Sequence, residues 1–159
     1  MDILRILGDE HEIKQVYHRY CDVIDSKVFE DLDQVFTADC IGDYRDTFGV
    51  VQKGLAPLRT HLNANLGRGS TCVGTHHNVL NFQISTDGER ATGKVHFYAV
   101  HRGVGAMSGK LYSVWGCYHD ELTRTEQGWR ISRRRYENYV TDGDKAVIGN
   151  GTQQPETTL

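Results

Sequence analysis

Residues 75–88, THHNVLNFQISTDG, decide the class of fold that this chain adopts. Leu80, Phe82 and Ile84 alternate there with polar residues. Alternation with a period of two is typical of a strand that buries one face. The Asp-Gly pair that ends the stretch is a strong signal for a β-hairpin turn. The stretch therefore predicts the first long strand of an antiparallel sheet.

The predicted sheet continues downstream of this strand. Three further strands are expected over residues 91–101, 110–123 and 129–140. A glycine-rich connection leads into the second of them, and a turn over residues 125–128 leads into the third. This order predicts a meander in which each strand pairs with the one before it.

The sequence upstream of residue 75 has mainly helical periodicity. Over residues 10–24, apolar residues recur three or four positions apart, which predicts a helix with one buried stripe. A second helix is expected over residues 29–36, and a third begins near Pro57, because proline is tolerated in the first turn. Between them, residues 40–52 are expected to form a short strand pair.

Helices followed by an antiparallel meander predict an α+β fold, with about three N-terminal helices packed on one face of a curved sheet. A strongly curved sheet covered by helices forms a cone, and such a cone encloses a cavity suited to a small molecule. We expect one domain over residues 1–140. Residues 141–159 are polar and mostly without period, which predicts a flexible tail that docks locally at residues 146–148.

The composition excludes several classes of function. Of the 159 residues, 38% are hydrophobic and 25% are charged, which is the balance of a soluble globular protein. The net charge of −3 argues against binding to nucleic acid or to an anionic membrane. No apolar run approaches the roughly 20 residues of a membrane span or the roughly 7 of a secretory signal core. We therefore expect a cytoplasmic protein.

No metal or other cofactor is expected. The four cysteines are widely spaced and form no CxxC pair, which argues against a structural zinc site and a disulfide scaffold. His76 and His77 are neighbours on a strand, so their side chains point to opposite faces and do not easily bind one ion.

A carboxylate and a histidine doublet are the candidate catalytic groups. Asp25 ends the first helix, where the helix dipole disfavours an anion, so it either caps the next helix or has a functional role. A histidine paired with a carboxylate gains basicity and a fixed tautomer, as general-base catalysis requires. Counting back from Leu80 in steps of two places His76 on the buried face, unless a bulge reverses the parity and buries His77.

Other polar and aromatic residues lie in core-like segments and either line the cavity or have structural roles. Tyr17 and Tyr20 lie on the apolar stripe of the first helix, and Tyr44 lies in the early strand. Arg133 shares a predicted face with Trp129; on an internal face it must be paired or bind a substrate carboxylate, and otherwise it is solvated. In the later strands the candidates are His96, Tyr98, His101, Tyr112, Trp115 and His119.

Taken in order, these motifs resemble the SnoaL-like branch of the NTF2-like superfamily. The resemblance covers roughly residues 8–140 and implies the same α+β cone. The motifs that carry it are YHRYCDVIDSK at 17–27, FxxLxxVF at 29–36, DYR at 43–45, THH at 75–77 and GWR at 128–130.

Among characterised groups, the chain resembles scytalone dehydratase, the hexachlorocyclohexane dehydrochlorinases and bile acid 7α-dehydratase. The resemblance implies a His–Asp dyad made of Asp25 and His77, with His76 as the alternative histidine. Tyr20 matches a tyrosine that precedes the aspartate by five residues in the bile acid enzyme. Tyr44 matches the tyrosine that polarises the substrate carbonyl through water in scytalone dehydratase.

The chain also departs from scytalone dehydratase. Ile24 stands where that enzyme has its second tyrosine, and its serine and asparagine on a later strand have no clear equivalents around residues 117–119. The resemblance implies that a second cavity histidine corresponds to His96. The substrate therefore need not be similar to scytalone.

The resemblance implies a cofactor-independent lyase of the dehydratase type, acting on a small hydrophobic cyclic molecule. His77, oriented by Asp25, removes a proton, while Tyr20 or Tyr44 stabilises the oxyanion or protonates the leaving group. Two alternatives stay open: an isomerase or cyclase of the polyketide or ketosteroid type, and a non-catalytic small-ligand-binding domain. The expected substrate-binding residues are Tyr17, His76, His96, Tyr98, Trp115 and Arg133.

A homo-oligomer is also expected, with a trimer favoured over a dimer. Aromatic residues assigned to the outer face of the sheet would otherwise be exposed to water. They are Phe97, Tyr112, Trp115 and Tyr118.

Overall fold

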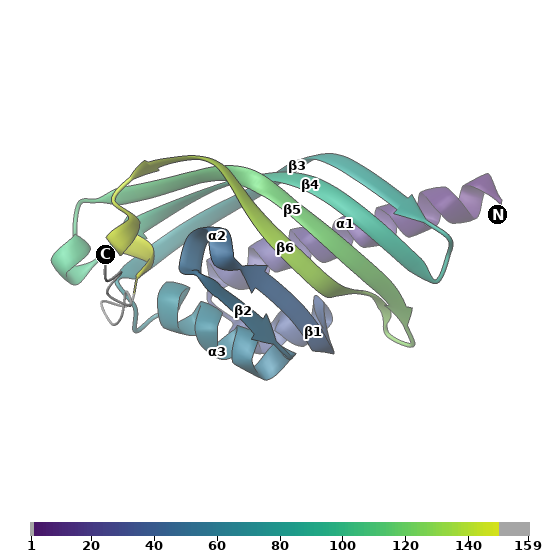
Figure 1. The fold of residues 1–159 in the computed structure, drawn as a ribbon, viewed down its shortest axis with the longest axis horizontal. Helices are drawn as coiled ribbons and strands as arrows, with labels where there is room; N and C mark the ends of the chain where they lie inside the picture. The colour runs from purple at the N-terminus through teal and green to yellow at the C-terminus, as the bar shows by residue number, and fades with distance from the viewer. Residues whose placement is uncertain (1, 150–159) are drawn as a thin grey trace, which may run out of the picture.

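One six-stranded sheet and the helices on its concave side make up the fold (Figure 1). The computed structural model describes residues 2–149. The elements in chain order are α1 (Ile3–Ser26), η1 (Phe29–Gln34), β1 (Phe36–Tyr44), α2 (Arg45–Phe48), β2 (Val50–Lys53), α3 (Leu55–Leu66), β3 (Cys72–Thr86), β4 (Arg90–Gly103), η2 (Gly105–Met107), β5 (Leu111–Thr125), β6 (Gly128–Gly143) and η3 (Lys145–Ile148).

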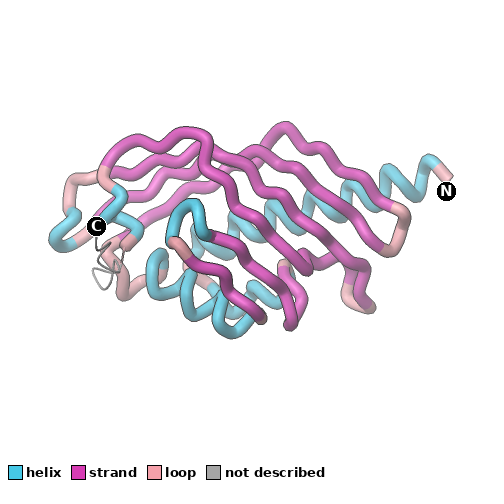
Figure 2. The backbone as a smooth tube through the Cα atoms, in the orientation of Figure 1, coloured by secondary structure: helices cyan, strands magenta, loops and turns pink. Residues whose placement is uncertain are grey.

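The strands follow the order β2-β1-β6-β5-β4-β3. β1 runs parallel to β6, and all other neighbours are antiparallel. The four long strands arch over α1, while α3 and the β1–β2 pair lie beneath one end of the arch (Figures 1 and 2). The predicted α+β cone with its meander is confirmed.

The N-terminal helices differ from the sequence prediction in length. α1 begins at Ile3, because the Asp2 carboxylate accepts a hydrogen bond from the Leu4 amide and caps the first turn. The second predicted helix is a short 3₁₀ segment, and the chain turns into β1 at Phe36. None of the described helices is long and apolar enough to cross a bilayer.

A bulge in β3 decides which histidine of the doublet faces the helices. The register between β3 and β4 shifts between Leu80 and Gln83, and Asn81 has a φ of 53°. An extra residue in one strand moves the following side chains to the other face. His77 therefore lies on the same face as Phe82, while Leu80 is 44% exposed. The parity count that favoured His76 is wrong for this reason.

A second irregularity decides which arginine of β6 is internal. Leu122 of β5 pairs with Ile131 of β6, but its neighbour Glu121 pairs with Arg133, so Ser132 is the extra residue of a bulge in β6. Ile131 is buried, but the next buried arginine is Arg134 rather than Arg133, which is exposed. The expectation that Arg133 could point inward is corrected by this bulge.

The ordered domain extends beyond the expected boundary at residue 140. β6 continues to Gly143, and the following η3 turn buries Val147 and Ile148 against the core. The Thr71 hydroxyl lies 3.1 Å from the Val147 carbonyl oxygen, which ties this turn to the start of β3. Residues 150–159 of the predicted tail lie outside the described residues.

The outer face of the sheet is less aromatic than expected. Phe97, Tyr112 and Tyr118 are buried on the concave side, whereas Trp115 is 39% exposed and stacks on Tyr98. The argument for a homo-oligomer therefore rests on a smaller patch, and the oligomer stays a prediction. All four cysteines are free and buried.

Candidate active site

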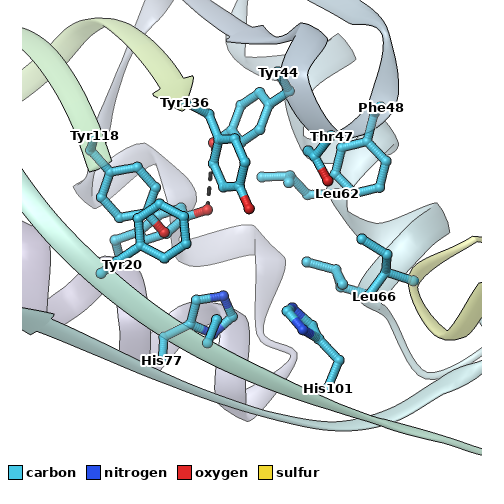
Figure 3. A pocket seen from close by; sticks show the side chains of 13 residues that line it. Tyr20, Tyr44, Thr47, Phe48, Leu62, Leu66, His77, His101, Tyr118 and Tyr136 are labelled. Carbon is cyan, nitrogen blue, oxygen red and sulfur yellow. Dashed lines mark hydrogen bonds between the residues drawn. The ribbon is translucent and has the colours of Figure 1, made fainter. Parts of the chain in front are cut away.

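A pocket lies between the concave face of the sheet and the helices (Figure 3). Atoms leave about 370 Å³ of space in and around it, a volume that includes open solvent at its mouth. Aromatic and aliphatic side chains form most of its wall, with hydroxyl and imidazole groups between them. Its lining residues are Tyr20, Tyr44, Thr47, Phe48, Leu62, Leu66, His77, Phe97, Ala99, His101, Tyr118, Tyr136 and Ile148.

Asp25 and His77 form a hydrogen-bonded pair at this pocket. His77 Nδ1 lies 2.7 Å from Asp25 Oδ1, and the His77 amide donates to Asp25 Oδ2 at 2.8 Å. Because a carboxylate only accepts, Nδ1 carries the proton of the neutral imidazole, and Nε2 keeps a free lone pair. Burial raises the pKa of the Asp25 carboxyl, but its hydrogen bonds and the His77 charge more than offset this and lower it below its ordinary value.

Asp25 has this geometry because α1 runs one residue past it. The helix ends at Ser26, with Lys27 in the left-handed conformation. η1 then begins after Val28, and no side chain caps it. The alternative that Asp25 caps the second helix is therefore wrong, and its carboxylate is directed at β3 instead.

Thr75 extends the pair into a chain of hydrogen bonds. Its hydroxyl donates to Asp25 Oδ1 at 2.9 Å and accepts from Lys27 Nζ at 2.9 Å. The direction is fixed, since an ammonium only donates and a carboxylate only accepts. This series of hydrogen bonds runs from Lys27 through Thr75 to Asp25. It fixes the orientation in which the carboxylate meets His77.

Replacing Thr75 with valine should raise the pKa of Asp25, because the carboxylate loses a donor. We expect the free energy of unfolding to fall by about 1 kcal/mol at neutral pH. A carboxyl whose pKa is lowered on folding stabilises the protein above its unfolded pKa of about 3.9, and the effect is lost as pH falls through the folded pKa. The difference between variant and parent should therefore shrink in acid.

Carbon NMR of the Asp25 carboxyl and urea unfolding at several pH values measure both effects. Thr92→Val, on the exposed face of β4, is the matched control and should change neither. An Asp25 pKa that is the same in Thr75→Val and in the parent would contradict a role of this hydrogen bond.

Two tyrosines line the pocket together with His77. The Tyr20 and Tyr44 hydroxyl oxygens are 3.4 Å apart, and the Tyr20 ring packs edge-on against the His77 ring at 6.2 Å (Figure 3). Burial raises the pKa of Tyr20 and raises that of Tyr44 well above its ordinary value. Both phenols are therefore protonated at neutral pH and act as hydrogen-bond donors.

A buried ion pair supports this tyrosine cluster. Arg134 and Asp120 have fully buried side chains, and Arg134 Nη2 lies 2.7 Å from Asp120 Oδ2. The guanidinium also lies 3.9 Å from the Tyr118 ring centroid and 4.3 Å from that of Tyr20. Burial alone lowers the pKa of Arg134, but the Asp120 carboxylate raises it well above its ordinary value, so the guanidinium stays charged.

His101 is the second imidazole of the pocket. Its ring stands perpendicular to the His77 ring at 5.6 Å, and its Nδ1 lies 3.0 Å from the Tyr112 carbonyl oxygen. Since that oxygen only accepts, Nδ1 carries the proton. Burial, together with the nearby charge of His77, lowers the pKa of His101 to about 3, so this ring stays neutral in the folded state.

The low pKa of His101 predicts acid-sensitive stability. An unfolded histidine binds a proton near pH 6.5, whereas folded His101 binds one only near pH 3. Stability is therefore full above about pH 6.5 and falls through this window by at most about 1.4 kcal/mol per pH unit. We expect His101→Asn, which can keep the bond to the Tyr112 carbonyl, to make the free energy of unfolding less dependent on pH in this window. Urea unfolding at neutral pH and near pH 4 measures it, with exposed His11→Asn as the control that keeps the slope.

The structure brings the four predicted catalytic residues together. Asp25 and His77 are paired, and Tyr20 and Tyr44 line the same pocket. Of the predicted substrate-binding residues, Tyr17 is buried but does not line the pocket, since its hydroxyl packs against Gly93 of β4.

The other five predicted substrate-binding residues lie on the outer surface and are corrected. Their side chains belong to the strand positions that alternate away from the helices, or follow one of the two bulges. They are His76, His96, Tyr98, Trp115 and Arg133.

Three residues that shape the pocket are not among the predicted site residues, and one of them, Tyr118, is expected from the sequence on the outer face of the sheet. Tyr118 and Tyr136 line it directly, while Thr47 reaches it from α2. The alternation of β5 on either side of Tyr118 was the available signal, since every second residue from Tyr112 to Leu122 is buried. The extra residues of both register shifts lie in β6, so the phase of Tyr136 could not be found from alternation alone. Among the described residues, no three His, Cys, Asp or Glu side chains converge as metal ligands.

Comparison with known proteins places the chain in a family. A family model described as a SnoaL-like domain matches residues 5–135. The uncharacterized protein Rv2910c of Mycobacterium tuberculosis (strain ATCC 25618 / H37Rv) is 33% identical over 129 residues, which are 80% of this chain and 84% of that protein.

Two solved structures show the same fold. A candidate scytalone dehydratase of Novosphingobium aromaticivorans DSM 12444 has a TM-score of 0.77 at 22% identity, covering 87% of this chain and 89% of that one. The hexachlorocyclohexane dehydrochlorinase LinA-type3 of Novosphingobium barchaimii LL02 has a TM-score of 0.76 at 14% identity, covering 97% and 100%. By its matched domain and its mycobacterial relative, the chain belongs to the SnoaL-like domain family.

Proposed function

We propose that this protein is a cofactor-independent lyase of the dehydratase type, which acts on a small hydrophobic cyclic molecule. The carrying observation is the 2.7 Å contact between Asp25 and His77 at the wall of a mostly apolar pocket. A general base needs a fixed tautomer and a partner for the charge it acquires, and Asp25 supplies both to His77.

His77 Nε2 is the proton acceptor in the proposed reaction. It takes a proton from the carbon next to a carbonyl group, and the electrons of that C–H bond form a C=C bond. The C–O bond to the leaving hydroxyl breaks with its electron pair, and its oxygen departs as water with the proton from His77, or with a proton from a tyrosine that His77 then restores. Asp25 stabilises the imidazolium that exists between these proton transfers.

Tyr20 and Tyr44 provide the hydrogen bonds that this reaction requires. Negative charge develops on the carbonyl oxygen as the proton leaves, and donors already in place stabilise it without reorganisation. Two neighbouring phenols that stay protonated at neutral pH suit this task. Either one can also protonate the leaving hydroxyl.

Two of the solved structures that share the fold favour an elimination reaction. Both structural neighbours described above are named for eliminations, one for the loss of water and the other for the loss of hydrogen chloride. A fold is shared by many activities, so this support is weaker than that of the dyad itself.

An isomerase or cyclase is the second candidate. The Tyr20–Tyr44 hydroxyl pair favours it, because an oxyanion site beside a base suffices for enolisation without a leaving group. A third outcome, binding without turnover, corresponds to a domain that only holds its ligand.

Incubation with neutral cyclic β-hydroxyketones in D₂O, followed by NMR and mass spectrometry, separates these functions. A lyase gives an enone that has lost one water. An isomerase gives deuterium exchange or a product of unchanged composition, and a binding domain gives neither. Enone formation that persists at full rate without the His77 imidazole would show that this mechanism is wrong.

A further inference from the structure

Two hydroxyl groups of the pocket have no part in the proposed elimination. Thr47 is 3% exposed and lines the pocket, and its hydroxyl has no hydrogen-bond partner among the described residues. Tyr136 lines the same wall, and Figure 3 shows its hydroxyl and that of Thr47 directed into one space. Burial raises the pKa of Tyr136 and the Thr47 hydroxyl lowers it, so the two hydroxyls are neighbours although their geometry is not that of a hydrogen bond.

A buried hydroxyl without a partner destabilises a protein. Thr47 follows Arg45 and Asp46 in the single turn of α2, so its position is set by the backbone rather than by a rotatable loop. A valine would fill the same space without an unsatisfied group. The hydroxyl therefore indicates a ligand atom that completes it, and the pocket provides the room for that atom.

The lining also restricts the charge of the ligand. Among the described residues that line the pocket there is no lysine, arginine, aspartate or glutamate. The Asp25 carboxylate already has His77 as its hydrogen-bond partner, and burial lowers the pKa of His101, so that this ring stays neutral. Arg134 is engaged by Asp120 and does not line the pocket. A carboxylate or ammonium on the ligand would thus be buried unpaired, which is strongly unfavourable.

We infer that Thr47 and Tyr136 form a subsite for a further oxygen function of an uncharged cyclic substrate, apart from the carbonyl oxygen held by Tyr20 and Tyr44 and apart from the leaving hydroxyl. This inference rests on the proposed function for those two oxygens and adds a third. A hydroxyl group fits best, since it can donate to Thr47 and accept from Tyr136. The substrate class is therefore a neutral ring system that carries at least three oxygens.

Binding of naphthalene derivatives tests this subsite without knowledge of the natural substrate. The probes are 2-naphthol, its charged counterpart 2-naphthoate, and the 1,5-, 2,6- and 2,7-naphthalenediols, measured by ligand-observed NMR at millimolar concentration. We expect at least one diol to bind about 3- to 10-fold more tightly than 2-naphthol, as one added neutral hydrogen bond allows. We expect 2-naphthoate to bind at least about 100-fold more weakly.

The variants Thr47→Val and Tyr136→Phe should each reduce the preference for the diol, and the double variant should remove it. Thr37→Val is the matched control, because the Thr37 hydroxyl is also buried and unpartnered but does not line the pocket. Tyr139→Phe, exposed on the same strand as Tyr136, is the second control. Both controls should keep the preference.

Three results would overturn the subsite: no diol binding better than 2-naphthol, a preference that survives the double variant, or tight binding of 2-naphthoate. Because Thr47→Val could affect folding, urea unfolding of the free variant is measured alongside. Its unfolding midpoint should be no lower than that of the parent.

The experiments test the subsite and the proposed function separately. His77→Ala should keep the preference for the diol over 2-naphthol while it loses turnover. A diol preference that depends on Thr47 and Tyr136, with no turnover in any assay, would leave the subsite standing and reject the lyase. Turnover that depends on His77, without any preference for the diol, would support the lyase and reject the subsite.

Discussion

Substituting alanine for His77 should lower the rate of elimination by about 10²–10⁴-fold, because the reaction loses its general base. Asp25→Asn should also lower the rate of elimination. Its amide removes the negative charge that stabilises the imidazolium, and an amide nitrogen facing Nδ1 favours the wrong tautomer. The binding of neutral naphthols should change little in both variants, so that the loss appears in kcat rather than in KM.

The chain offers neighbouring controls for both substitutions. His76→Ala removes the adjacent imidazole, which is exposed and lies 3.3 Å from the Asn78 side-chain oxygen. Asp22→Asn changes an exposed carboxylate of α1 one turn before Asp25. Both control variants should retain the parent rate. A loss of activity in His76→Ala equal to that in His77→Ala would contradict the assignment of the base.

The largest effect on stability is expected from Asp120→Ala. This change leaves the Arg134 guanidinium buried without its carboxylate partner, in a site where neither side chain has any exposed area. Removing one member of a buried ion pair costs about 3–5 kcal/mol, since the remaining charge is neither solvated nor paired. The cost should appear in urea unfolding as a lower midpoint with an unchanged m-value.

Two further variants define the origin of this loss. Lys110→Met breaks the exposed pair between Lys110 and Asp144, whose side chains are 49% and 39% exposed, and should cost no more than about 1 kcal/mol. Replacing both buried partners, as Asp120→Leu with Arg134→Met, should recover most of the stability lost in Asp120→Ala. A double variant as unstable as Asp120→Ala would show that the packing around the pair, rather than the unpaired charge, causes the loss.

Much of the fold could be predicted from the sequence because it depends on local patterns. The alternation around Phe82, the Asp-Gly turn after β3 and the apolar stripe of α1 each specify an element through its own periodicity. The start of α1 was placed too late, because its first turn is capped by Asp2 and the apolar residues there, Ile3, Leu4 and Leu7, are exposed and do not belong to the buried stripe. The short η1 segment was predicted too long, since Phe29, Leu32 and Phe36 have helical spacing although Phe36 already belongs to a strand.

The candidate site could be predicted only in part. Asp25, His77, Tyr20 and Tyr44 were identified through the order of motifs along the chain. The outward-facing candidates of the sheet, such as His96 and Tyr98, could not be distinguished from inward-facing ones without the phase of each strand. His101, which the structure places beside His77, was one of several equivalent histidines in the sequence.

The sequence by itself determined the class of fold, the order of its elements, the negative net charge and the residue types available for proton transfer. Only the tertiary structure decided that His77 rather than His76, and Arg134 rather than Arg133, face the interior. The physical reason is that side chains of a strand alternate strictly between two faces. One extra residue at a bulge therefore exchanges the faces of everything beyond it, and the bulge is set by pairing with the neighbouring strand.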